Sequence, residues 1–440
     1  MGALVALALL APTAVANKFE VTRHNDPKPG KCKPKDCSLR EAILRANKHA
    51  GKDAVVLPNG RRAYRLSRPN APAGISEQAG RRGDLDVKGR LILRHPGRGL
   101  ATIDAQGVDR VLEVLPGGNA TIRSIKLTGG DAAFQPLAPR MPRRRGGGSN
   151  GGAIFSDTGR VTLIGSRVAD NAADGAGGIW SFGGKLRLVR TKVVNNKGLA
   201  GVMAGDARVS RSTVRGNEQL GLYILERGAV KRTRVARNGR SGIVFEGADA
   251  TVRGSTLSRN GGSGISITFP SDVSIVNSTV SRNRTTTFGG GIDISGSTGT
   301  AEVRINSVTV VGNVADTDGD MFGNGGGIRA SMADVSVVNS IVSRNRVAGA
   351  ANDCWGTFDS PGGNLLSTID DCTGFNPGGG DFLAANPKLG KLKRNGGPTK
   401  THALRKGSPA IGKAVKAAAP KRDQRGVKRG RKPDIGAYER

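Results

Sequence analysis

Residues 166–171 read SRVADN, and this short segment returns in altered form along most of the chain. The later copies are TKVVNN, STVRGN, TRVARN, STLSRN, STVSRN, VTVVGN and SIVSRN. Each copy ends on an asparagine, and these residues are Asn171, Asn196, Asn217, Asn238, Asn260, Asn283, Asn313 and Asn345. Successive spacings are 25, 21, 21, 22, 23, 30 and 32 residues. A repeat near this length is typical of a solenoid.

The residues around each asparagine indicate which kind of solenoid this is. Counting back from the asparagine, the third and eighth residues are aliphatic in every copy, and the fifth is Ser or Thr in all but one. After a turn of variable length comes a glycine followed by an aliphatic residue, as in Gly178-Ile179. Alternating β-branched residues predict short strands, three in each repeat, and no copy holds the sustained 3.6-residue period of a helix. We therefore predict an all-β, right-handed parallel β-helix with coils ~4.8 Å apart over residues 61–351.

The repeated asparagines are expected to form a structural ladder. Asparagine tolerates the left-handed backbone conformation that tight turns use, so each is predicted to adopt it. Stacked copies can then hydrogen-bond their side-chain amides from coil to coil along the solenoid axis.

The first residues, MGALVALALLAPTAVANKFE, indicate export. Their apolar run is shorter than the roughly 20 residues that cross a bilayer, and Ala14-Val15-Ala16 resembles a signal-peptidase site. We expect a signal peptide at residues 1–16, no transmembrane helix, and a secreted or cell-surface protein. A buried N-terminal strand is the alternative, and the missing basic n-region leaves open whether Met1 is the true start.

The four cysteines form two close pairs, Cys32 with Cys37 and Cys354 with Cys372. An even number of locally paired cysteines in an exported chain predicts two disulfides. A metal site is the competing interpretation, and no histidine stands beside either pair to support it.

The chain is strongly basic, with 68 Lys and Arg against 35 Asp and Glu and a formal net charge of +33. Such a charge predicts affinity for polyanions such as acidic polysaccharide, teichoic-type polymer or nucleic acid, or else a merely solvated surface. The residue before the ladder asparagine is arginine in three successive repeats, namely Arg237, Arg259 and Arg282. Like charges stacked ~5 Å apart repel, which favours an acidic partner along this row.

Near the N-terminus, residues 37–43 read CSLREAI. Ser38 and Glu41 can form a capping box, and Leu39, Ala42, Ile43 and Ala46 share one helical face. A helix there would cover the open end of the solenoid. CSLREAI resembles the signature of the CSLREA domain of secreted bacterial β-helix proteins, which places such a cap at residues 17–60.

The C-terminal residues 352–440 carry NGGPTKTHAL, GSPAIG, DQRG and DIGAYE. Together these segments are similar to the end of choice-of-anchor Q proteins, a group of exported surface β-helices. The cysteine often found before DQRG in that group is absent, since residues 417–420 read AAAP. His402, within the THAL segment, is expected to be structural rather than catalytic.

A candidate ligand-binding row follows the repeated glycine-aliphatic pair. The next residue should point outward, and in successive repeats it is Phe155, Trp180, Met203, Tyr223, Val244, Ser266, Asp293 and Arg329. Two positions earlier stands Ala153 and then glycine throughout, which predicts a shallow groove beside an apolar row on which sugar rings could stack. The alternative is that the loop at 131–150 or the C-terminal segment covers this row.

Other residues could carry metal or catalytic chemistry. Asp316, Asp318 and Asp320 alternate in one loop, a spacing that suits Ca²⁺ although it does not follow the EF-hand order. Asp293 and Arg329 lie in neighbouring repeats and could serve a lyase or glycoside hydrolase, or form a plain salt bridge. GGGSNGG at 146–152 lacks the Lys-Ser/Thr of a phosphate loop, so no nucleotide cofactor is expected.

These features favour a monomeric, non-catalytic β-helix that binds extracellular polysaccharide, acidic in character, or another surface polyanion. The binding residues would be the first four of the outward row, Phe155, Trp180, Met203 and Tyr223, with the three stacked arginines. A polysaccharide lyase or glycoside hydrolase that uses Asp293, Arg329 and Ca²⁺ is the first alternative. A structural surface spacer or adhesin is the second.

Overall fold

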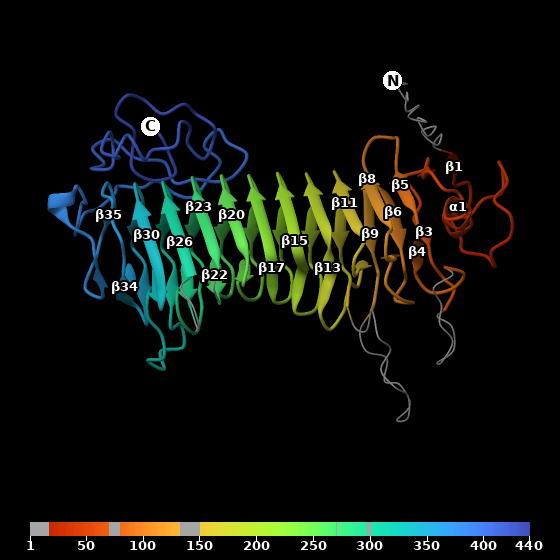
Figure 1. Ribbon diagram of the computed structural model, residues 1–440, viewed down its shortest axis with the longest axis horizontal. Coiled ribbons are helices and arrows are strands. Elements are labelled where there is room, and N and C mark those ends of the chain that lie inside the picture. The colour runs from red at the N-terminus through yellow and green to blue at the C-terminus, as the bar shows by residue number, and fades with distance from the viewer. Residues whose placement is uncertain (1–16, 70–79, 133–149, 270, 297–300) are drawn as a thin grey trace, which may run out of the picture.

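The computed structural model of the protein describes residues 17–69, 80–132, 150–269, 271–296 and 301–440. Its coils stack along one long axis, from a helical cap at the N-terminal end to a segment packed on one side near the C-terminal end (Figure 1). Coil pairs with coil in parallel throughout the solenoid, with partners one repeat apart, as in Val168 with Val193 and Val193 with Val214. The predicted right-handed parallel β-helix is confirmed.

Three sheets, here called A, B and C in the order in which the chain visits them, run the length of the solenoid. Sheet A holds β4 (Leu85–Val87), β7 (Leu112–Val114), β10 (Ile154–Ser156), the first parts of β13 (Ala176–Val189), β15 (Ala200–Ser210) and β17 (Leu220–Lys231), then β19 (Ile243–Glu246), β22 (Ile265–Thr268), β25 (Ile292–Ser295), β29 (Ile328–Ser331) and β34 (Cys354–Thr357). Sheet B holds β1 (Lys18–Glu20), β2 (Lys52–Val56), β5 (Arg90–Arg94), β8 (Asn119–Arg123), β11 (Arg160–Ile164), the second parts of β13, β15 and β17, then β20 (Asp249–Arg253), β23 (Asp272–Val276), β26 (Ala301–Asn306) and β30 (Ala333–Val338).

Sheet C contains one short strand from each coil. Its members are β3 (Tyr64–Arg65), β6 (Ala101–Asp104), β9 (Ile125–Thr128), β12 (Arg167–Ala169), β14 (Lys192–Val194), β16 (Thr213–Arg215), β18 (Arg234–Ala236), β21 (Thr256–Ser258), β24 (Thr279–Ser281), β27 (Thr309–Val311), β31 (Ile341–Ser343) and β35 (Leu365–Leu366). A small extra sheet joins β28 (Val314–Ala315), β32 (Arg346–Val347) and β33 (Ala350–Ala351), while β36 (Cys372–Thr373) pairs with β34.

The core is a narrow stack of aliphatic columns. Leu163, Val168 and Ile179 stand in one coil, and these residues and their counterparts in the following coils are completely buried. Inward residues alternate with partly exposed ones along most strands, as the two-residue period of the sequence predicts. Because each coil repeats the same contacts, no single coil carries the stability of the fold.

The repeated asparagines form a continuous, directional hydrogen-bond chain inside the solenoid. The side-chain Nδ2 of each donates to Oδ1 of the next at 2.8–3.0 Å, from Asn171 through Asn345. Gly130 N donates to the first Oδ1, and the last Nδ2 donates to Asp353 Oδ1 at 2.9 Å. Asp353 closes the chain because its other oxygen accepts three further hydrogen bonds, from Ser367 N and Oγ and from Thr368 N.

The left-handed conformation does not fall on these asparagines, so that expectation was wrong. It falls on the residue before each of them, as at Asp170, Arg237 and Arg282, with φ of 60°, 56° and 59°. The turn reverses the chain at that residue, which leaves the asparagine side chain directed inward and fully hydrogen-bonded. A second column, of serine and threonine, works in the same way where sheet B meets sheet C, for example with Thr191 N donating to Ser212 Oγ at 3.1 Å.

Helix α1 (Leu39–Ala46) covers the first coils, as predicted. The capping box of Ser38 and Glu41 is present, and the predicted apolar face is buried. Within this helix Arg40 is also buried, with a bidentate ion pair to Asp26 at 2.8 Å and hydrogen bonds to the carbonyl oxygens of residues 80, 82, 83 and 84. Arg40 thus ties the helix to the first coils, a role that the helical pattern alone did not indicate.

The C-terminal residues lie across sheet C. Gln424 bonds to Thr256 and Thr279, and Arg429 Nη2 donates to Asn277 Oδ1 at 3.1 Å. A small apolar cluster, in which Ile435 packs with residues of β27 and β31, supports the same contact. The C-terminal segment therefore covers sheet C and not the outward row of sheet A.

Both predicted disulfides, Cys32–Cys37 and Cys354–Cys372, are present. None of the helices in the described ranges has the length and apolar character needed to cross a membrane.

Candidate functional site

The predicted outward row lies in register along sheet A. Phe155 pairs with Trp180, Trp180 with Met203, and Met203 with Tyr223. The same register continues through Val244, Ser266, Asp293 and Arg329. It also extends beyond the predicted limits, to Asp86 and Glu113 on the N-terminal side and to Trp355 on the C-terminal side. The row is therefore a single line of side chains that changes from acidic to apolar to charged.

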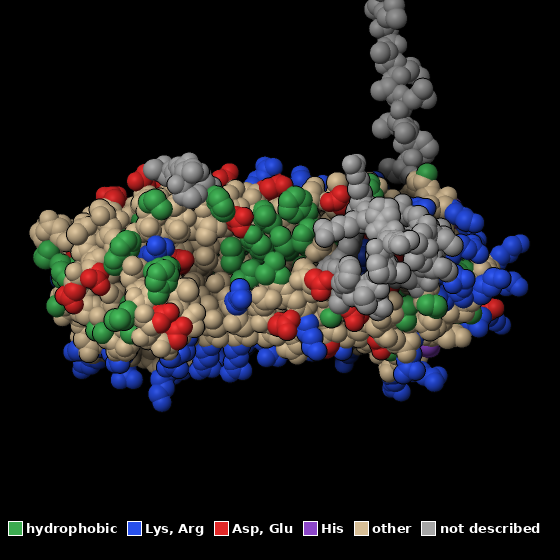
Figure 2. All heavy atoms as spheres, turned by 90° about the horizontal axis from the view of Figure 1, so that it is seen from below, with side chains coloured by type: hydrophobic (Ala, Val, Ile, Leu, Met, Phe, Trp, Pro, Cys, Tyr) green, Lys and Arg blue, Asp and Glu red, His purple; other side chains and the backbone are tan. Residues whose placement is uncertain are grey.

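The middle of the row is apolar and partly exposed. Trp180, Met203 and Tyr223 are half-buried, and Phe182, two residues after Trp180, is 41% exposed. The rings of Trp180 and Phe182 are nearly parallel, with centroids 6.0 Å apart. Figure 2 shows hydrophobic side chains gathered near the middle of one long face, with a line of Lys and Arg along an edge. Phe182 was missed, although the alternation from Trp180 would have placed it on the same face.

Tyr223 is held in place by an acidic neighbour. Its hydroxyl donates to Glu246 Oε2. Burial, together with this hydrogen bond and the charge of Glu246, raises the pKa of Tyr223 to about 12. Its hydroxyl therefore stays protonated and fixed, and the side chain remains partly exposed.

Phe155 is not available for a ligand. It is only 5% exposed, and the guanidinium of Arg110 lies 5.0 Å from the centre of its ring. Arg110 also pairs with Glu113 at 3.0 Å and Asp84 at 3.6 Å. Burial, followed by the charge of Asp109, raises the pKa of Asp84 well above its usual range. This acidic end of the row, which the sequence analysis did not single out, is thus a closely packed charge cluster.

The repeated glycines do not form a groove, which corrects the prediction made from alternation. A Cβ on Gly178 would lie 3.3 Å from Asn196 Nδ2, and one on Gly201 would lie 2.5 Å from Asn217 Cγ. These glycines face the asparagine chain of the following coil, where nothing larger than hydrogen fits. They are required by internal packing, because the strand bends at this point and the alternation breaks. The apolar row is accordingly a flat strip on the surface of sheet A.

Asp293 and Arg329 form an ion pair under two loops. Arg329 Nη1 lies 3.2 Å from Asp293 Oδ1, and both side chains are less than a fifth exposed. Two aromatic rings flank the guanidinium, with centroids at 4.3 Å for Phe288 and 5.6 Å for Trp355. Burial raises the pKa of Asp293, and the charge of Arg329 partly opposes this. The charges of Asp293 and Arg329 are thus paired with each other.

The three-aspartate loop brings its carboxylates together. One oxygen from each of Asp316, Asp318 and Asp320 lies within 4.8 Å of the others. Asp316 is 1% exposed, and its Oδ1 receives no hydrogen bond from the described residues. Burial first, then the charges of Asp320 and Asp318, raise the pKa of Asp316. A divalent cation would relieve both the repulsion and the unpaired oxygen.

The stacked arginines lie on a different part of the surface from the apolar strip. Arg237 and Arg259 are exposed, and their charges act on Arg234 of sheet C and on Lys400 of the C-terminal segment. Within the described residues no contact joins them to the strip on sheet A. The structure therefore separates two groups of residues that the sequence analysis had combined in one binding site.

His402 is structural in its contacts. Its Nδ1 lies 2.7 Å from Gly390 O and its Nε2 lies 3.0 Å from Ser281 Oγ, so the ring joins the C-terminal segment to sheet C. Burial and, to a lesser degree, the charges of Arg282 and Arg344 lower the pKa of His402 to about 4. The neutral ring donates from Nδ1 and accepts the serine hydroxyl at Nε2.

A family model described as the right handed beta helix region matches residues 198–364, the coils from β15 to β34. No curated protein sequence matches the chain. Among solved structures, the chain is similar to pectate lyase Pel9A, with 12% identity, 98% of each chain covered and a TM-score of 0.48. It is also similar to the Dettilon tailspike protein, with 15% identity, 84% and 69% of the two chains covered and a TM-score of 0.41. The A-module of the Azotobacter vinelandii mannuronan C-5 epimerase AlgE4 has 14% identity, 72% and 94% coverage and a TM-score of 0.41.

Proposed function

We propose that this β-helix is a non-catalytic polysaccharide-binding protein of the cell exterior, and that its ligand lies along the apolar strip of sheet A. The observation that supports the proposal most is the half-exposed Trp180, stacked with Phe182 and in register with Met203 and Tyr223. Flat aromatic faces next to fixed polar groups suit sugar rings, which offer one apolar face and polar edges. Two disulfides are consistent with an oxidising compartment.

The same face offers little to support catalysis. The best acid–base candidates, Asp293 and Arg329, are paired at 3.2 Å, and aromatic rings flank the guanidinium. A general base must be able to reach a substrate proton, and a guanidinium keeps its own proton at ordinary pH. Ion pairing and side-chain stacking account for both residues without a reaction. We therefore place the lyase or hydrolase alternative second.

A glycan-binding assay with Trp180→Ala tests this proposal. Aromatic contacts at the centre of an interface carry binding energy of roughly 1–3 kcal/mol, so affinity should fall about 5- to 150-fold. Stability should change little because Trp180 is outside the core. Phe269→Ala is a matched control, because Phe269 is 47% exposed but follows the end of β22 and is outside the row. Unchanged binding by Trp180→Ala, or an equal loss in the control, would remove the support for a ligand on this strip.

A further inference from the structure

From Arg237 onward, the column of residues before the ladder asparagines is arginine except at one coil. This part of the column contains Arg237, Arg259 and Arg282, then Gly312, then Arg344, and all five have φ between 56° and 65°. The four arginines are exposed. A Cβ on Gly312 would meet only Arg282 Cγ, at 3.8 Å, so this coil leaves open space. With coils ~4.8 Å apart, the gap between the backbones at Arg282 and Arg344 is roughly 10 Å wide.

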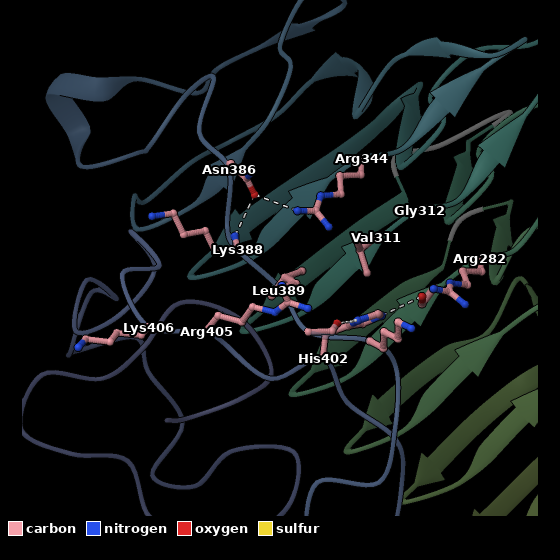
Figure 3. Close-up of a pocket in the computed structure, with 13 residues that line it drawn as sticks. Arg282, Val311, Gly312, Arg344, Asn386, Lys388, Leu389, His402, Arg405 and Lys406 are labelled. Carbon is pink, nitrogen blue, oxygen red and sulfur yellow. Dashed lines mark hydrogen bonds between the residues drawn. The ribbon is translucent and has the colours of Figure 1, made fainter.

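The C-terminal segment encloses this gap and turns it into a pocket of about 430 Å³. Val311, Leu389 and His402 contribute to its lining. Six of the residues that line it are basic and none is acidic, and Figure 3 labels five of these six. The basic residues are Arg282, Arg344, Lys388, Lys391, Arg405 and Lys406. They come from two parts of the chain that only the packing of the C-terminal segment brings together.

The charges of this pocket are not neutralised internally. Among the described residues, none of the six basic groups lies within ion-pair distance of a carboxylate, whereas ion pairs do occur elsewhere, as between Arg425 and Asp423 at 2.8 Å. Arg344 Nη2 donates only to the neutral Asn386 Oδ1, at 3.0 Å. The neighbouring His402 stays uncharged at neutral pH. A cluster of cations without counter-ions is unfavourable on its own and becomes favourable when an anion binds.

We propose that this pocket, here called the cationic pocket, binds the anionic groups of an acidic polysaccharide. Guanidinium groups form paired, charge-assisted hydrogen bonds with carboxylate, sulfate or phosphate oxygens. Arg259 and Arg237 continue the column beyond Arg282 in steps of ~5 Å, so they offer further sites to a polymer with repeated charges. This inference deepens the proposed function by naming the charge of the ligand, but it rests on residues away from the apolar strip.

The composition of the pocket favours an acidic polysaccharide over a nucleic acid. Proteins that hold single-stranded nucleic acid stack its bases on aromatic side chains, and the lining contains no Phe, Tyr or Trp. Reading of duplex DNA commonly uses a helix or ribbon in the major groove, and α1, the one α-helix of the described residues, lies at the opposite end of the solenoid. Two disulfides also place the chain more naturally outside the cell.

Titrations of the full chain test the proposal. The probes are a polyuronate, dextran sulfate, neutral dextran, inorganic phosphate and single-stranded DNA, each at low and at high salt. Arg282→Gln/Arg344→Gln is compared with Arg187→Gln/Arg208→Gln, which removes the same charge from exposed, paired positions of sheet B. We expect the pocket variant to bind the polyuronate or dextran sulfate at least tenfold more weakly than the sheet B variant. The difference should shrink as salt rises, because salt screens these charges.

Several results would overturn the cationic pocket. Equal weakening by the two double variants would mean that only net charge matters. Binding of DNA with the same dependence on Arg282 and Arg344 would point to nucleic acid instead, and binding of inorganic phosphate without either polymer would point to a small anion. Trp180→Ala separates this inference from the proposed function. If Trp180→Ala weakens binding and the pocket variant does not, only the cationic pocket fails, and the reverse result removes only the apolar strip.

Discussion

Replacement of one asparagine inside the solenoid should lower the stability of the protein well beyond what a single side chain usually does. Asn238 is 2% exposed. Its Oδ1 accepts from Asn217 N at 3.2 Å and Asn217 Nδ2 at 3.0 Å, and its own Nδ2 donates to Asn260 Oδ1 at 3.0 Å. In Asn238→Ala two buried donors of Asn217 lose their acceptor. At about 1–3 kcal/mol for each unpaired buried group, the free energy of unfolding should fall by about 2–6 kcal/mol.

Because the asparagine hydrogen bonds all run in one direction, a substitution that removes only the donor gives a more specific prediction. Asn238→Asp keeps the acceptor for Asn217 but replaces the donor with an oxygen that faces Asn260 Oδ1. It should therefore destabilise the protein at neutral pH, and acidification should restore part of the loss because a protonated carboxyl can donate again. At Asp353, the last residue of this hydrogen-bond chain, the structure requires two acceptor oxygens and no donor. Asp353→Asn should be destabilising because its Oδ2 now accepts three hydrogen bonds.

Urea unfolding followed by circular dichroism measures these changes, and hydrogen exchange of the neighbouring coils shows whether the effect is local. Arg187→Gln, an exposed substitution on sheet B, is the control and should be nearly neutral. A free energy of unfolding for Asn238→Ala within about 0.5 kcal/mol of the wild type would refute the reasoning, since that is the scatter expected of surface substitutions.

Three further predictions concern titration, metal and the ion pair. Because His402 has a pKa of about 4 in the folded state against about 6.5 unfolded, the free energy of unfolding should fall by up to about 3 kcal/mol as pH drops from 6.5 to 4. Urea unfolding of His402→Gln should show that this part of the pH dependence is lost, and a variant that keeps the full pH dependence would contradict the role of His402. Millimolar Ca²⁺ should raise the melting temperature of the wild type but not of Asp316→Asn, and a wild type that does not respond would argue against a metal in this loop. Asp293→Asn should lower the melting temperature by several degrees because Arg329 loses its ion-pair partner. The wild type should release no unsaturated uronate from a polyuronate. Ultraviolet absorbance that rises with the wild type and not with Asp293→Asn would instead support a lyase.

Much of the fold could be predicted from the sequence because a solenoid repeats its own pattern. The columns of Val, Ser and Asn are visible without any long-range information, and each coil meets only its neighbours. The capping box of α1 is likewise local. The left-handed residue was misplaced by one position because Asp, Asn, Gly and Arg all occupy that column, so its composition points to no single conformation.

The site was harder to predict because it depends on contacts between distant residues. Alternation placed Trp180 and Tyr223 correctly but also suggested a glycine groove, and the bend that turns those glycines inward has no signal in the sequence. The position of the C-terminal segment, which encloses the cationic pocket, depends on contacts such as Gln424 with Thr256, 168 residues apart. Asp353 was missed as the end of the asparagine chain because it replaces the repeated residue with a different one.

The most direct test of the central claim uses the two tryptophans of the chain. Trp180 and Trp355 both belong to the outward row of sheet A, so tryptophan fluorescence, excited selectively, reports on this face alone. In Trp355→Phe the single remaining tryptophan lies in the apolar strip, and titration with a polysaccharide that binds by calorimetry should produce a saturable change in its emission, with the same midpoint. Calorimetric binding with no change in the emission of Trp180 would contradict a ligand on the strip.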